Sequence, residues 1–257
     1  MKILAIGDVT SPKGIEYLRA SLWKKRRELE ADLCIVNGEN ASFITGISPE
    51  LAEELFRAGA DVITGGNHTL MNKAAYTALE DEKNLLRPIN FGDSAPGHGY
   101  TVVEVKGYRV LVISAMGNVH IEPTLDAPYS YIDRVLAREE GRYDLAVLDI
   151  HAEATGEKYA VAHTYDGRIS VIFGTHTHVP TADEQILPRG TGYITDIGMC
   201  GESGGILGID TETICLRMRT HLPARYKAAE GKVVAHGALF WVNESTRRVE
   251  KIERISF

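Results

Sequence analysis

Short apolar runs alternate with amphipathic stretches through the first half of the sequence, and this alternation constrains the fold more than any other feature. Strands are predicted at residues 2–7, 33–37 and 62–64, with helices at residues 16–30 and 49–58 between them. Strands that alternate with helices are typical of an α/β protein, in which helices cover a sheet. Each predicted strand ends in a polar turn that contains glycine.

The rest of the sequence favours further strands. A hairpin is predicted at residues 100–114 with its turn at 106–107, a helix at 129–140, and buried strands at 145–150 and 171–174. The last third is dominated by β-type alternation, at residues 193–197, 213–217, 233–242 and 249–255. We therefore expect an α/β fold with one mixed sheet or two stacked sheets and helices outside. No Pro/Ser-rich linker divides the chain, so a single domain over residues 1–257 is predicted.

Composition and charge narrow the possible partners. The formal net charge of −7 argues against long nucleic acid, whose binding needs a basic face along the whole contact. A small anionic ligand is compatible with this charge, because bound metal ions can supply local positive charge. No apolar run reaches membrane-spanning length, and the N-terminus lacks the pattern of a signal peptide, so no membrane partner is expected. Three widely spaced cysteines, Cys34, Cys200 and Cys215, favour a reducing, cytoplasmic location.

Side chains that can bind metal ions recur where five of the predicted strands end. They are Asp8, Glu39, Asn40, Asn67, His68, His151, His176 and His178. In α/β sheets, loops at the carboxyl ends of strands are where binding sites gather. Each residue alone has an ordinary alternative: Asp8 and Asn67 could be turn residues, and His151 could be a core histidine. The His-x-His pair could be an incidental surface pair.

Taken together, these residues point to a metal site. In an extended segment, residues two apart face the same side, so His176 and His178 are expected to reach one metal cluster. Carboxylate, carboxamide and imidazole ligands form a mixed set of nitrogen and oxygen donors. Such a set favours manganese, iron or zinc over calcium.

The order of these motifs resembles that of the calcineurin-like metallophosphoesterases. A closer resemblance is to the YmdB-type branch, described as 2′,3′-cyclic-nucleotide phosphodiesterases. The resemblance rests on Gly7-Asp8, Asn37-Gly38-Glu39-Asn40-Ala41, Gly65-Gly66-Asn67-His68, Asp149-Ile150-His151-Ala152-Glu153, residues 174–183 and Thr195-Asp196-Ile197-Gly198-Met199. It extends from the first strand to about residue 201. It implies a metallophosphoesterase-like sandwich of mixed β-sheets flanked by helices.

The sequence departs from the general superfamily in two places. The usual first motif is Asp-x-His, but here it reads Asp8-Val9-Thr10, and Glu39 replaces the usual bridging aspartate. The resemblance implies that Asn40 supplies the missing ligand, although Asn40 could instead lie behind the ligands. One metal would then bind Asp8, Glu39, Asn40 and His178, and the other Glu39, Asn67, His151 and His176. Glu39 would bridge the two ions, and His68 would remain unbound to metal.

This ligand set implies two transition-metal ions, with iron expected and manganese as the alternative. A hydroxide that bridges the metals would attack a 2′,3′-cyclic nucleotide, and His68 would act as general acid. Activity on 3′,5′-cyclic nucleotides is also expected, since few residues are obvious candidates for reading the base. The alternatives are a phosphomonoesterase, a hydrolase of another small phosphodiester, or a regulatory nucleotide-binding protein that retains the metals. The resemblance also implies a homo-oligomer.

Overall fold

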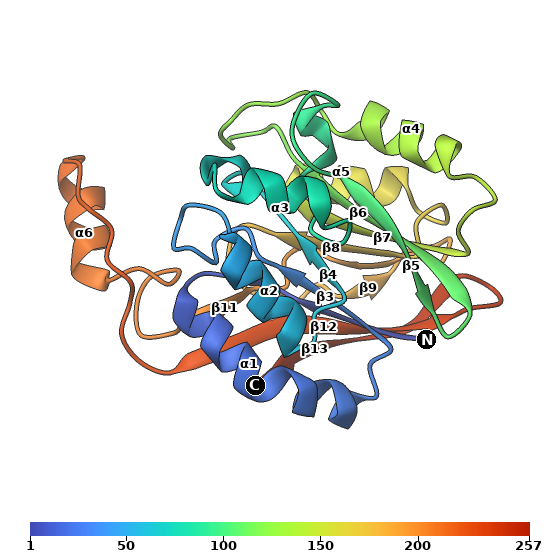
Figure 1. Cartoon of the computed structure of the whole chain (residues 1–257), viewed down its shortest axis with the longest axis horizontal. Coiled ribbons are helices and arrows are strands. Elements are labelled where there is room, and N and C mark those ends of the chain that lie inside the picture. Colours follow the sequence, from blue (N-terminus) through green and yellow to red (C-terminus); the bar gives the residue numbers. More distant parts are fainter.

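The computed structural model describes residues 1–257, and its first sheet gathers strands from both ends of the chain (Figure 1). The strand order is β2-β11-β12-β1-β3-β4. Strand β13 lies outside this order and pairs with β12. These strands are β1 (Lys2–Ile6), β2 (Asp8–Val9), β3 (Leu33–Asn37), β4 (Val62–Thr64), β11 (Met199–Glu202), β12 (Val233–Asn243) and β13 (Arg248–Ser256). Because β1, β3 and β4 are parallel, their carboxyl ends lie at one edge of the sheet.

The second sheet is formed by the middle of the chain, in the order β5-β6-β7-β8-β10-β9. Its strands are β5 (Tyr100–Val105), β6 (Tyr108–Met116), β7 (Leu145–His151), β8 (Val171–Thr175), β9 (Gln185–Ile186) and β10 (Gly192–Ile194). The four inner strands are parallel, and the two edge strands are antiparallel to their neighbours. All seven residues of β7 are buried, as expected for a parallel strand that is covered on both faces.

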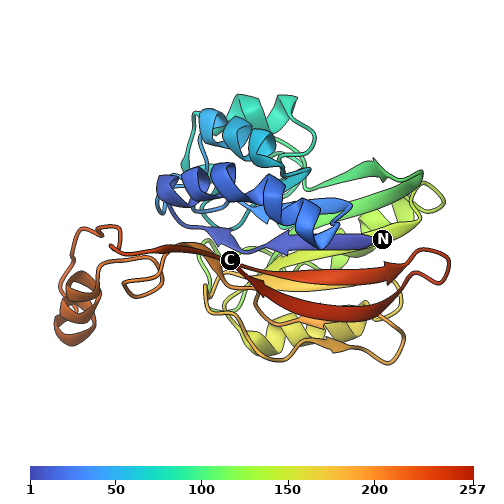
Figure 2. The same cartoon turned by 90° about the horizontal axis from the view of Figure 1, so that it is seen from below.

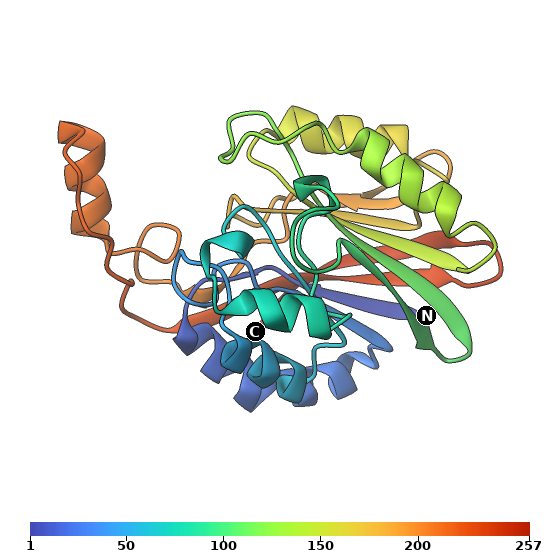
Figure 3. The ribbon, with the colours of Figure 1, turned by 45° about the horizontal axis from the view of Figure 1, so that its top comes forward.

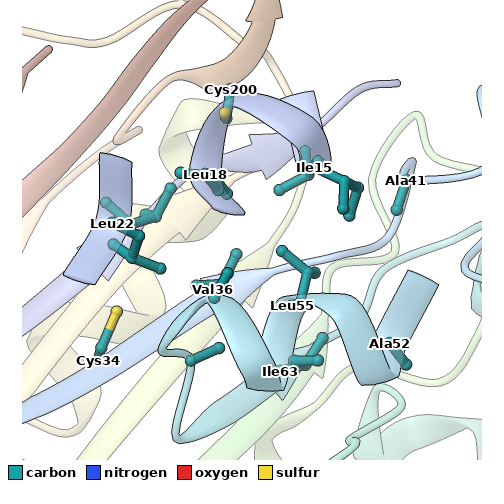
Figure 4. Close-up of a cluster of buried hydrophobic side chains, with 14 of the residues drawn as sticks. Ile15, Leu18, Leu22, Cys34, Val36, Ala41, Ala52, Leu55, Ile63 and Cys200 are labelled. Atoms are coloured by element: carbon teal, nitrogen blue, oxygen red, sulfur yellow. The ribbon is translucent and has the colours of Figure 1, made fainter. Parts of the chain in front are cut away.

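Helices cover the outer faces of the two stacked sheets, as Figure 2 shows. The helices are α1 (Pro12–Leu29), α2 (Pro49–Ala58), α3 (Ala75–Asp81), α4 (Tyr129–Arg138), α5 (Thr155–Thr164) and α6 (Thr211–Thr220). Buried apolar side chains fill three layers, and Figure 4 shows part of the layer in which Leu18 and Leu55 of the helices meet Val36. A second layer lies between the sheets and includes Ile3 and Val147. The third packs α4 and α5 against the second sheet.

Residues 203–232, here called the arm, project from this sandwich and carry α6 at their far end (Figures 1 and 3). Backbone bonds close the base of the arm, where Asp210 N donates to the Lys227 carbonyl and Ala229 N to the Gly208 carbonyl. No other helix or strand packs substantially against α6. None of the helices combines the length and the hydrophobicity that membrane crossing requires.

The predicted α/β sandwich of mixed sheets with flanking helices is confirmed. The prediction of β-structure at residues 213–217 is wrong, because these residues belong to α6. Thr213 and Ile214 gave this segment its strand-like pattern, but the Asp210 side chain caps a helix by accepting from Thr213 N at 2.9 Å. The first helix begins at Pro12 rather than residue 16, because Ser11 caps it. Helix α5 was not predicted.

Candidate metal centre

The carboxyl ends of β1, β3, β4, β7 and β8 converge at one edge of the two sheets. The last residues of these strands and the segments that follow them are here called the site loops. They carry all eight residues predicted for the site: Asp8, Glu39, Asn40, Asn67, His68, His151, His176 and His178. The two sheets meet there through a hydrogen bond, which His176 N donates to Asp8 Oδ2 at 3.1 Å. The structure therefore brings together residues that lie 168 positions apart in the sequence.

One group of potential ligands lies around Asp8. Ligand atoms of Asp8, Glu39 and His178 all lie within 4.8 Å of one another. Asn40 lies beside them, since its Nδ2 is 3.4 Å from His178 Nε2. Two carboxylates, a carboxamide and an imidazole at these separations could hold one metal ion.

A second group lies around His151. Its Nε2 is 3.0 Å from Asn67 Oδ1 and 3.1 Å from His176 Nδ1. Glu39 Oε2 lies 3.8 Å from the same nitrogen, so the Glu39 carboxylate lies between the two groups. Gly66 makes room for this packing, because a Cβ at that position would overlap the His151 ring.

The protein fixes which nitrogen of each of these imidazoles faces the site. His178 Nδ1 must donate to the Leu207 carbonyl at 3.1 Å, so Nε2 carries the lone pair and faces Asn40 Nδ2 at 3.4 Å. His176 Nε2 lies 3.2 Å from Glu153 Oε2, so Glu153 lies at the ring nitrogen that does not face His151. Outer hydrogen bonds of this kind are what orient histidines that bind metals.

His151 is oriented by a longer relay. Its Nδ1 is 2.9 Å from Thr175 Oγ1, and the Thr175 hydroxyl donates in turn to Asp149 Oδ1 at 2.7 Å. Thr175 has one hydroxyl hydrogen, so it must accept from His151 Nδ1 if it donates to Asp149. The buried Asp149 carboxylate also accepts from Thr64 at 2.5 Å and Asn37 at 2.9 Å. His151 Nε2 then faces His176 Nδ1 at 3.1 Å, and two imidazole nitrogens at this separation could share a bound cation.

Several buried acceptors at the site have no hydrogen-bond partner. They are Asp8 Oδ1, Glu39 Oε1 and Asn40 Oδ1. Leaving a buried polar atom unpaired costs about 1–3 kcal/mol, and more for a charged group. Burial and the neighbouring charge of Glu39 also raise the pKa of Asp8 well above its usual range. A bound cation would satisfy these oxygens and oppose both causes of the shift, so the residues fit a metal site.

Burial also keeps the facing imidazoles neutral. It lowers the pKa of His151 well below the usual value, and it lowers the pKa of His176 as well. A neutral imidazole is the form that binds a metal ion.

The backbone of the His-x-His segment differs from the prediction. His176 has a φ of 98° and His178 a φ of 63°, so the segment is not extended. The alternation of an extended chain was therefore the wrong reason to expect both imidazoles in one cluster. The turn is held instead by Asp196, which accepts from both the backbone N and the hydroxyl of Thr177. A buried ion pair of 2.8 Å with Lys158 of α5 balances the Asp196 charge.

His68 also lies in a turn rather than in an extended segment, with φ −90° and ψ −5°. The side chains of Asn67 and His68 lie close together, since Asn67 Nδ2 is 3.4 Å from His68 Nε2. His68 Nδ1 lies 2.9 Å from Glu39 Oε2. Burial opposes a charge on His68, but the hydrogen bond to Glu39 and its charge outweigh burial and raise the pKa.

The residues that contact the outer side of the histidines were not identified as functional residues from the sequence. Asp149 and Glu153 stand in the motif around His151, so the motif held a signal for them. Thr175 was visible only as the residue between Gly174 and His176. No sequence signal identifies Leu207, since it is brought to His178 by the base of the arm.

Comparisons with known proteins found relatives that match nearly all of the chain. Residues 4–255 match the model of a family described as YmdB-like protein. The chain is 42% identical to the 2′,3′-cyclic-nucleotide 2′-phosphodiesterase of Bacillus subtilis, over 99% of this chain and 96% of that protein. A crystal structure of a novel phosphatase from Mycoplasma pneumoniae is 32% identical, with a TM-score of 0.91 over 100% of this chain and 93% of that one.

More distant structures share the fold alone. A 5′-nucleotidase precursor from Thermus thermophilus is 11% identical, with a TM-score of 0.56 over 100% of this chain and 54% of that one.

Proposed function

The chain belongs to the YmdB-like family, and from this premise we propose that it is a metal-dependent phosphodiesterase that hydrolyses 2′,3′-cyclic nucleotides. The observation that carries the proposal is the set of unpartnered buried acceptors at the site loops, Asp8 Oδ1, Glu39 Oε1 and Asn40 Oδ1. The name of the Bacillus subtilis relative supports the substrate class.

We assign the eight site residues to two metal positions and one acid. Asp8, Glu39, Asn40 and His178 would hold one ion, and Glu39, Asn67, His151 and His176 the other, with Glu39 as the bridge. The two groups of ligand atoms on either side of Glu39 support this division. Mixed oxygen and imidazole ligands suit iron, our first choice, or manganese.

Once bound, the two ions would supply a nucleophile from water at neutral pH and offset negative charge on the phosphate. The chain itself provides the protonation. His68 lies beside Glu39, and we assign to it the transfer of a proton to the 2′ oxygen as that oxygen leaves, so that a 3′-phosphate results. Thr175, Glu153 and the Leu207 carbonyl would hold the imidazoles in the tautomer that binds metal.

A second candidate is a phosphomonoesterase, since the Mycoplasma pneumoniae structure carries the name phosphatase. The metal site alone does not identify the leaving group. A hydrolase of another small diester, activity on 3′,5′-cyclic nucleotides, and a regulatory protein that binds nucleotides without turnover are further outcomes to test.

Turnover of a substrate panel by the full-length protein, purified without chelator, tests this function. The panel contains 2′,3′-cyclic, 3′,5′-cyclic and linear diesters and nucleoside monophosphates. The proposal predicts the highest kcat/KM on 2′,3′-cyclic nucleotides, with a 3′-phosphate as product. Preference for monophosphates would favour the phosphomonoesterase, and tight binding without turnover would favour the regulatory protein.

We further propose that residues 1–257 act as one domain in the cytoplasm. The family match extends over 4–255, and β12 and β13 near the C-terminus complete the sheet that β1 begins. The three cysteines are free thiols, as a reducing compartment would keep them.

The arm supports our proposal of a homo-oligomer. Helix α6 has 10 residues, and isolated helices of this length are marginal in water. Leu216, Met218 and Leu222 of the arm are more than half exposed. The arm contains five basic and three acidic residues, whereas the whole chain has a net charge of −7. A second copy of this acidic chain would therefore complement the arm in both charge and apolar surface.

A further inference from the structure

A cavity of about 460 Å³ lies away from the site loops, between α4 and the segment that leads into β5 (both labelled in Figure 1). None of the eight metal-site residues lines it. Its volume lies within the range of about 300–1,000 Å³ that is usual for small-molecule sites. The lysine, arginine and tyrosine residues of its lining are Lys83, Arg87, Tyr100, Tyr131, Arg134 and Arg138.

The cavity is strongly basic, with four cations and Asp93 as the only carboxylate in its lining. Asp93 lies 3.4 Å from Arg134 in a pair whose side chains are 91% and 60% exposed, so the pair adds little stability and is easily exchanged. Arg138 lies 3.8 Å from Glu139, which already accepts a hydrogen bond from Tyr100. Anions in the cavity would therefore meet more positive than negative charge, and both arginine pairs are long and largely exposed on the arginine side.

Arg87 gives this charge a fixed position. Its side chain is bonded to five backbone carbonyls, those of Pro88, Ile89, Gly92, Ala95 and Pro96. Carbonyl oxygens hold the guanidinium in place without cancelling its charge. The loop around Arg87 is thus a preorganised wall, and the exposed side chains of Arg134 and Arg138 on the opposite helix could exchange their carboxylate partners for a ligand.

One face of α4 presents the ligand-binding groups together. Tyr131, Arg134 and Arg138 are spaced by three and four positions, so they share a helix face. The Arg134 guanidinium lies 5.3 Å from the centroid of the Tyr131 ring. Arginine forks suit phosphate oxygens, and aromatic rings stack on nucleobases. Tyr100 supplies a second ring in the lining.

We propose that this cavity is a second ligand site, which binds a small molecule with both a phosphate group and an aromatic ring, such as a nucleoside monophosphate. The arginines of α4 contact the phosphate, and Tyr131 packs against the ring. The proposal is independent of the function assigned to the metal centre.

Titration calorimetry on the metal-loaded full-length protein tests the site, with adenosine 3′-monophosphate as the probe. The double variant Arg134→Ala/Arg138→Ala should weaken one binding event by about tenfold or more for each arginine, because each loses a charge-assisted hydrogen bond. Both side chains are exposed, so the fold should survive. Arg142→Ala, which removes an equally exposed arginine outside the cavity, should bind as the wild type does.

Two further measurements distinguish the contribution of the phosphate to binding from that of the aromatic ring. Tyr131→Leu should weaken binding of the nucleotide about 10–100-fold and leave binding of inorganic phosphate unchanged. Inorganic phosphate and adenosine should each bind more weakly at this site than the nucleotide does. The proposal is overturned if the double variant binds the nucleotide as the wild type does, or if either fragment alone binds as tightly as the whole molecule.

Discussion

A hydrogen bond from His178 to the Leu207 carbonyl joins the site loops to the arm, but the two regions are held in place in opposite ways. In the site loops, hydrogen bonds join residues from both sheets. His151, for example, contacts Asn67 at 3.0 Å and Thr175 at 2.9 Å. In the arm, the ordered contacts are mostly between residues of the arm itself, and α6 packs against no other element substantially.

This difference in packing limits what each region can do. The site loops hold unpartnered buried oxygens and facing imidazole nitrogens, and a dense framework keeps these groups close together. The arm has no such framework, and it exposes apolar side chains that a partner outside the chain would cover. Substitutions in the site loops should therefore change chemistry while the assembly survives, and substitutions in the arm should do the reverse.

The largest effect is expected for Glu39→Gln, which removes the charge that we place between both metals. Turnover should be abolished and both metals weakened, while the fold is retained because the two side chains have the same size. Circular dichroism and metal content are measured on the same sample. The matched control is Glu53→Gln on the exposed surface of α2, which should behave as the wild type. A Glu39→Gln protein that keeps two metals and a near-normal rate would remove Glu39 as the bridge.

His68→Ala should keep its metals and lose about 10²–10⁴ in rate on a substrate with a poor leaving group, the usual contribution of a general acid. On a nitrophenyl diester the loss should be much smaller, since nitrophenolate leaves without a proton. The rates on both substrates and the metal content are measured for the variant and the wild type. The control is His163→Ala, at an exposed position. Equal losses on the two substrates would indicate a positioning role, and loss of metal would make His68 a ligand.

Thr175→Val keeps the shape of the side chain but removes the hydroxyl between His151 and Asp149. Metal affinity or activity should fall about 10–100-fold, as is usual when a residue behind a metal-binding histidine is changed. Metal competition with a chelator measures the affinity. Thr164→Val, at an exposed hydroxyl of α5, is the control. If Thr175→Val binds metal as the wild type does, the relay through Thr175 does not orient His151.

The smallest effect on chemistry is expected in the arm. Leu216→Asp/Met218→Asp places charges on exposed apolar positions, so the oligomer should dissociate while turnover per chain stays unchanged. Sedimentation velocity gives the mass, and Ile186→Asp on exposed β9 is the control. A wild type that sediments as a monomer, or a double variant that retains the wild-type mass, would contradict the assigned role of the arm.

Features set by local sequence signals could be predicted, and features held by distant parts of the chain could not. The strand ends that carry Glu39 and His151 were predictable because apolar runs and glycine turns are local signals. The positive φ of His176 and His178 was not, because the buried Lys158–Asp196 pair holds that turn from distant elements. Helix α6 was mistaken for a strand because β-branched residues begin it and no buried face contributes helical periodicity.

The most direct test of the metal centre is to count and locate its ions. Elemental analysis of protein purified without chelator should find two transition-metal ions per chain, iron or manganese. Anomalous scattering from its crystals should place one peak on each side of the Glu39 carboxylate, the first near His178 and the second near His151. A fully loaded sample with one metal per chain, and no second peak beside Glu39, would contradict the account.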